Sequence, residues 1–82
     1  MGSFTENMRT TLIDMARTIR AQVEIERSKR PDLDFELLAV ATTATLIEEQ
    51  AAESTSLTST QLIGLMGDLK DAMQDMTLLT GS

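Results

Sequence analysis

The sequence contains no cysteine, histidine, tyrosine or tryptophan, and its aromatic residues are Phe4 and Phe35 alone. Without cysteine, a disulfide, a thiolate metal site and a cysteine nucleophile are excluded. Without histidine, the chain lacks the side chain that most often acts as general base. Its serines and threonines have no such base to activate them. We therefore predict that the protein is not an enzyme, with no catalytic residues, no cofactor and no small-molecule substrate.

Carboxylates are the remaining candidate metal ligands. Asp68, Asp71 and Asp75 share one face of an expected helix, and Glu49 and Glu53 are four residues apart. Oxygen clusters of this kind can hold Ca²⁺ or Mg²⁺. However, the spacing is typical of a solvated acidic face, and a di-iron bundle site would need histidine as well. We predict no specific metal site.

Long apolar runs are also missing. No stretch approaches the roughly 20 residues of a membrane-spanning helix, and Glu6 stands before the first apolar stretch, which does not suit a secretory signal peptide. We therefore expect no membrane span and a cytoplasmic location, with signal-independent secretion as the alternative. The opening residues 1–3 have the form of a cloning remnant, and we expect one domain over residues 4–82.

The net charge of −6 is unevenly distributed. Residues 4–30 carry six bases and four acids, whereas residues 31–82 carry nine acids and one base, Lys70. This pattern indicates either a basic first helix beside acidic helices of the same bundle or dimer, or a basic surface for an acidic partner. An acidic chain without stacking aromatic residues argues against nucleic acid as a partner.

Apolar residues recur at helical spacing through the first segment and predict a helix over about 4–29. Pro31 ends this helix, because a residue before proline is pushed away from helical geometry. Asp32 is then the expected N-cap of a second helix over about 33–54. So short a connection predicts an antiparallel hairpin.

The second segment carries apolar residues at alternating intervals of four and three, and the same spacing predicts a third helix over about 59–79. Leu38, Ala41 and Leu46 widen the apolar face of the second helix. The two apolar seams consist of Leu33, Leu37, Val40, Ala44, Ile47 and Ala51, and of Leu62, Leu65, Leu69, Ala72, Met76 and Leu79.

The heptad register slips between these two seams. At the slip, Thr58 and Gln61 have the spacing of a capping box, and Leu57 and Leu62 that of its hydrophobic staple. We expect these four residues to form a cap or hinge, with the helix broken near Ser56. The alternative is one continuous helix whose last part projects as a long arm.

Opposite charges three or four residues apart predict ion pairs along the first helix. These pairs are Asp14 with Arg17, Arg20 with Glu24, and Glu26 with Arg30. On the second helix, a solvated or cross-helix paired acidic face is expected from Glu48, Glu49 and Glu53.

Gly64 and Gly67 lie inside the third predicted helix, where each is unfavourable by about 1 kcal/mol relative to alanine. They indicate either close packing or a hinge, or they are tolerated on an exposed turn.

Together these elements predict an all-α fold. It is either a three-helix up-down-up bundle or a helical hairpin with a third helix. Two broad apolar helices exceed what a three-helix core covers, so we expect self-association through coiled-coil-like packing, as a homodimer or a higher oligomer.

The third helix is apolar around more than one face, and methionine is common on surfaces that receive varied partners. Gap-filling in an aromatic-poor core is the other interpretation. We predict a non-enzymatic protein–protein interaction module, such as an adaptor, docking or chaperone-like domain, that acts through this face. The predicted partner-binding residues are Ile63, Leu65, Met66, Leu69, Met73 and Met76.

One stretch loosely resembles the second half of type III secretion needle subunits, which are short, aromatic-poor helical hairpins. The matching residues are Arg30-Pro31-Asp32, Leu37-Leu38-Ala39, Ser59-Thr60, Met66-Gly67-Asp68-Leu69 and Met73. The chain lacks that family's second turn proline and second-helix tyrosine, and it has extra residues before Ser59. The resemblance implies an alternative function as a structural subunit of a helical filament.

Overall fold

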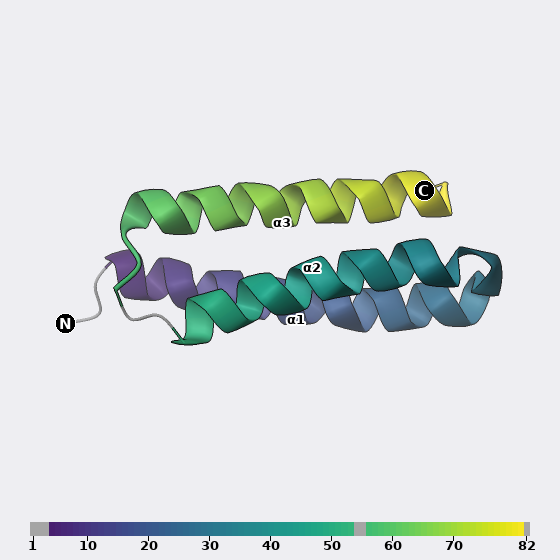
Figure 1. The fold of residues 1–82 in the computed structure, drawn as a ribbon, viewed down its shortest axis with the longest axis horizontal. Helices are drawn as coiled ribbons and strands as arrows, with labels where there is room; N and C mark the ends of the chain where they lie inside the picture. Colours follow the sequence, from purple (N-terminus) through teal and green to yellow (C-terminus); the bar gives the residue numbers. More distant parts are fainter. Residues whose placement is uncertain (1–3, 54–55, 82) are drawn as a thin grey trace.

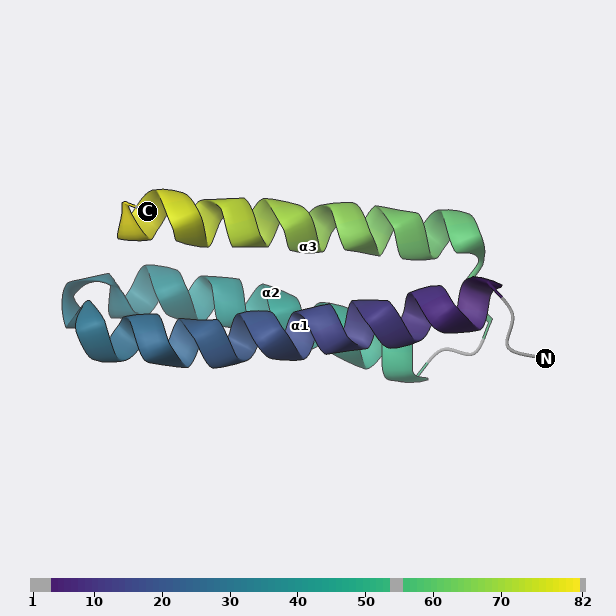
Figure 2. The same ribbon diagram turned by 180° about the vertical axis from the view of Figure 1, so that it is seen from behind.

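The computed structural model of the chain describes residues 4–53 and 56–81, and these ranges form three α-helices and one short 3₁₀ turn (Figure 1). The elements are α1 (Phe4–Lys29), η1 (Pro31–Leu33), α2 (Asp34–Glu53) and α3 (Ser59–Thr80). The predicted all-α fold is confirmed. The helices run up, down and up, so α2 is antiparallel to both neighbours (Figures 1 and 2). The bundle measures 45 × 17 × 16 Å.

The core lies where the apolar seams of the three helices meet. Each large side chain that is fully buried there contributes about 1.5–3 kcal/mol relative to an exposed one. The buried apolar residues are Leu12, Ala16, Ile19, Val23, Leu37, Val40, Ala44, Ile47, Ala51, Leu62, Leu69, Ala72 and Met76. Of the two predicted seams, only Leu33, Leu65 and Leu79 stay partly exposed, and they pack against this core.

The turn between α1 and α2 differs from the prediction. Asp32 does not cap a helix, because residues 31–33 form η1 and α2 begins at Asp34. The N–H of Leu33 donates to the carbonyl of Arg30 at 3.0 Å. Arg30 has φ −129° and ψ 72°, outside helical geometry, as the following proline requires. The Asp32 carboxylate instead accepts two hydrogen bonds from Arg30, from Nε at 3.2 Å and Nη2 at 3.1 Å.

At its start, α3 folds back along α2, so the alternative of a projecting arm is wrong (Figure 1). The capping box is present. The Thr58 hydroxyl accepts from the N–H of Gln61 at 3.2 Å, and the N–H of Thr58 donates to Gln61 Oε1 at 2.9 Å. Leu62 is fully buried and Leu57 packs against the core. The predicted end of the second helix at Ser54 and the remnant at residues 1–3 lie outside the described residues.

Most ion pairs join α1 to α2 or lie at the turn between them, and one, between Arg27 and Glu24, lies within α1. Glu48 accepts a hydrogen bond from Arg17 Nε at 3.1 Å, and its other oxygen lies 2.6 Å from Arg20 Nη2 without hydrogen-bond geometry. Arg30 forms an ion pair with Asp32. The pairs predicted from spacing within α1 are therefore wrong, because carboxylates beyond α1 attract the same arginines. Of the three glutamates predicted as a solvated or cross-helix paired face, Glu48 pairs across helices, whereas Glu49 and Glu53 are exposed.

Candidate partner-binding site

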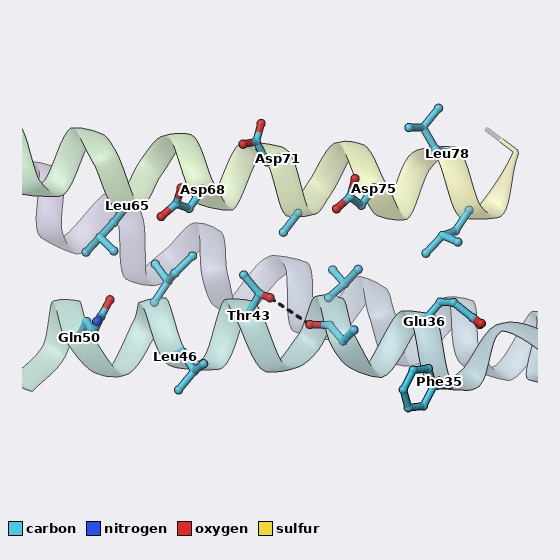
Figure 3. Close-up of a pocket in the computed structure, with 15 residues that line it drawn as sticks. Phe35, Glu36, Thr43, Leu46, Gln50, Leu65, Asp68, Asp71, Asp75 and Leu78 are labelled. Carbon is cyan, nitrogen blue, oxygen red and sulfur yellow. Dashed lines mark hydrogen bonds between the residues drawn. The ribbon is translucent and has the colours of Figure 1, made fainter.

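An open groove with a volume of about 890 Å³ runs between α2 and α3, and we call it the α2–α3 groove (Figure 3). The buried seams of α2 and α3 face the shared core. The residues next to each seam therefore lie opposite one another and form the two walls of the groove. Val40 and Ile47 of α2 and Ala72 of α3 lie at its floor and are buried. Leu65 and Leu79 of α3 also line it and are half-buried. The floor is therefore apolar.

Three large apolar side chains are exposed around this groove. Phe35 is 82% exposed, Leu46 56% and Leu78 79%. Figure 3 shows Phe35 and Leu46 on the side of α2 that points away from α3, and Leu78 on the side of α3 that points away from α2. The two helices thus carry an apolar outer rim on either side of the groove. Large apolar side chains left exposed beside a groove make it a candidate surface for contact with a partner.

Every charged residue that lines the groove is acidic. These residues are Glu36 of α2 and Asp68, Asp71 and Asp75 of α3. Asp68 and Asp75 are directed towards the groove, whereas Asp71 points outwards from α3 (Figure 3). The α2 wall is neutral beyond Glu36, and its Thr43 hydroxyl donates to the carbonyl of Ala39 at 3.1 Å. The negative charge is therefore concentrated on the α3 wall.

The groove continues towards the N-terminus of α3. A second hollow shares Gln50, Leu65 and Asp68 with it and is also lined by Leu57 and Gln61. Two of the four residues predicted as a cap or hinge, Leu57 and Gln61, therefore border the same surface. The capping box fixes the position at which α3 begins, and with it the position of this end of the groove.

The structure divides the six predicted partner-binding residues among three environments. Leu69 and Met76 belong to the core, and Met66 is half-buried against it. Leu65 lines the groove. Ile63 and Met73 are exposed, on an edge of α3 outside the groove lining.

Sequence reasoning missed Phe35 and Leu78 as surface residues. It found Leu46 only as part of a wide apolar face. For the two α2 residues, Phe35 and Leu46, a signal was present in the sequence. Phe35, Ala39 and Leu46 are separated by nearly whole helical turns, which places an apolar stripe beside the buried seam of α2.

The shifted pKa values lie at the α1–α2 turn and not in the groove. The hydrogen bonds from Arg30 lower the pKa of Asp32 below its ordinary value and raise the pKa of Arg30 in turn. Arg27 donates to Asp34 at 2.7 Å, and this hydrogen bond raises the pKa of Arg27. These shifts follow from ion pairs that hold the turn together.

Over residues 4–53 and 56–81, histidine, cysteine, aspartate and glutamate form no group of three placed to hold a metal ion. None of the helices formed by these residues is both long enough and apolar enough to cross a membrane. Comparisons with protein-family models, curated proteins and solved structures found no match. The function is therefore inferred from the residues of this chain.

Proposed function

We propose that the protein is a non-enzymatic interaction module, of the adaptor, docking or chaperone-like kind, which binds a helical segment of a partner protein in the α2–α3 groove. The observation that carries this proposal is the exposed apolar rim of Phe35, Leu46 and Leu78 around an apolar floor. A helix laid into such a groove buries its own apolar face.

The dimensions of the groove suit a helix. Its lining on α3 runs from Leu65 to Leu79, which at 1.5 Å per residue is about 21 Å. A partner helix of about 14 residues, four turns long, matches that length. Two helices packed side by side also leave a continuous furrow in which a third helix seats its ridge of side chains.

The self-association expected from the sequence belongs to the same proposal but uses a different surface. Ile63 and Met73 are exposed on the edge of α3 outside the groove lining. A second copy can cover these side chains while a partner helix occupies the groove.

A display library of helical peptides about 14 residues long tests the proposal. Binders are selected on the wild-type protein, and their affinities are measured for two double variants. Leu46→Gln/Leu78→Gln changes the groove, whereas Ile63→Gln/Met73→Gln changes the other exposed edge of α3. All four residues are exposed, so both variants should keep the helical circular dichroism of the wild type. We expect the groove variant to lose about tenfold in affinity, which corresponds to 1.4 kcal/mol, and the edge variant to stay close to wild type.

The opposite result, in which only the edge variant loses affinity, would move the partner site to the α3 face that the sequence predicts. A library that yields no binder dependent on either surface would overturn the proposal.

A further inference from the structure

We infer that the α2–α3 groove receives a basic amphipathic helix of another protein, with lysine or arginine side chains facing Asp68 and Asp75. This inference rests on the proposed function of the groove and adds the chemistry of its occupant. Three features of the groove support the inference: its floor is apolar, its acids lie mainly on the α3 wall, and no basic residue lines it to compensate their charge.

The acids of the groove are not neutralised by the residues around them. Glu36, Asp68, Asp71 and Asp75 line the groove together with no lysine or arginine. The ion pairs found among the described residues lie within α1, join α1 to α2 or lie at the turn between them, and none includes these four acids. An occupant that brings positive charge therefore gains attraction, and an occupant with negative charge is repelled.

The spacing of the acids specifies the register of the occupant. Asp68 and Asp75 are seven residues apart, about 10 Å along α3. A helix lying alongside α3 matches both when two of its own bases are seven residues apart. The opposite wall carries one acid, Glu36 near the start of α2, and is uncharged from Ala39 to Gln50. The occupant therefore needs bases mainly on the flank that faces α3. This requirement sets the rotation of the bound helix about its own axis.

A second copy of this chain lacks a face with these properties. Its own α2–α3 face repeats the four acids, and Lys70, the only base of residues 31–82, lies outside the groove lining. Its α1 is basic, but the exposed large apolar residues of α1 are Phe4 and Ile25, too far apart to form a stripe. Nucleic acids and anionic lipid surfaces would meet like charge at the acidic wall.

Three synthetic peptides of about 14 residues test the inference on the full chain. Each carries the same leucine face, and two positions seven residues apart on one flank hold lysine, glutamine or glutamate. Their dissociation constants are measured by fluorescence anisotropy at low and high salt. We expect the lysine peptide to bind roughly three- to tenfold more tightly than the glutamine peptide, as two exposed ion pairs allow. The glutamate peptide should bind least, and high salt should reduce the differences.

Two isosteric variants locate the charge effect. Asp68→Asn/Asp75→Asn should remove the preference for lysine. Asp14→Asn/Glu49→Gln changes the net charge equally at exposed positions outside the groove lining and should keep the preference. If all three peptides bind equally well, or if the preference survives in Asp68→Asn/Asp75→Asn, the inference is overturned while the groove remains a binding site. If neither the peptides nor the library bind, both proposals fail.

Discussion

At the scale of single residues, neighbours in the sequence have opposite environments, as Leu62 and Ile63 illustrate. Leu62 is fully buried, whereas Ile63 is 57% exposed. We predict that Leu62→Ala lowers the free energy of unfolding by about 2–5 kcal/mol through lost burial and the cavity left behind. Ile63→Ala should change it by no more than about 0.5 kcal/mol. Urea denaturation followed by circular dichroism measures both, and equal effects would mean that α3 packs through a different face.

The Arg30–Asp32 pair makes stability depend on pH. Hydrogen bonds from Arg30 lower the pKa of Asp32 below 3.8 in the folded chain. The pair therefore stabilises the fold at pH values above the unfolded pKa, and this contribution is lost as the pH falls through the folded pKa. We predict that Asp32→Asn is less stable than wild type at neutral pH and that the difference closes in acid.

An NMR titration of the Asp32 side-chain carbon tests the cause directly. The midpoint should lie below 3.8 in the wild-type protein. It should rise when Arg30→Met removes both the donor and the positive charge. A wild-type midpoint at or above 3.8 would contradict this account of the turn.

At the scale of elements, the capping box decides how firmly α3 begins. Thr58 and Gln61 exchange hydrogen bonds that satisfy backbone groups left open at a helix N-terminus. Thr58→Ala should cost about 0.5–2 kcal/mol. Thr60→Ala is the matched control, since Thr60 is exposed within α3, and it should change stability by less than about 0.5 kcal/mol. Similar losses in the two variants would show that the box does not stabilise the helix.

The glycines of α3 sit in open space. A Cβ added at Gly64 or Gly67 would meet nothing within 4 Å, so the chain itself does not pack closely on either of them. We therefore predict that Gly64→Ala/Gly67→Ala raises the free energy of unfolding by up to about 1 kcal/mol per site, through helix propensity. Thermal unfolding measures the change. A lowered melting temperature would show that α3 needs to bend at these positions.

Local features were predictable from the sequence, whereas features that depend on how helices face one another were not. The three helices and the Thr58–Gln61 box follow from periodicity and from spacing within one turn. Arg20 contacts Glu48 instead of Glu24 because helix packing brings a distant carboxylate nearer. A heptad seam also tells which residues point inwards, but not which flank stays uncovered. For that reason the candidate groove was found only through Leu65 among the predicted partner-binding residues.

At the scale of the whole molecule, packing pairs some of the charges in the basic and acidic blocks of the sequence and leaves others unpaired. Arg17 and Arg20 of the basic α1 pair with Glu48 of α2, and Arg27 pairs with Asp34. The acids of α3 receive no such partner among the described residues. The bundle therefore keeps an acidic face along the groove, opposite in sign to its first helix. Such a field guides the encounter with a cationic partner and opposes contact between two identical acidic faces.

This field leads to a last prediction, in which one variant has opposite effects on two kinds of assembly. Asp68→Asn/Asp75→Asn should weaken the binding of a lysine-bearing helix. It should strengthen any self-association through the groove, because the like charges that keep two such faces apart are removed. Sedimentation velocity over a range of protein concentration measures the second effect.

High salt should act on the wild-type protein in the same direction as the variant, since screening also weakens the repulsion. A dimer that forms equally well in the wild type and the variant would use another surface, of which the exposed Ile63 and Met73 edge is the candidate. Long filaments in negative stain would favour the needle-like alternative over a discrete dimer. The response to removing two carboxylates thus separates an occupant of opposite charge from a second copy, because only the second copy brings the same acids to the interface.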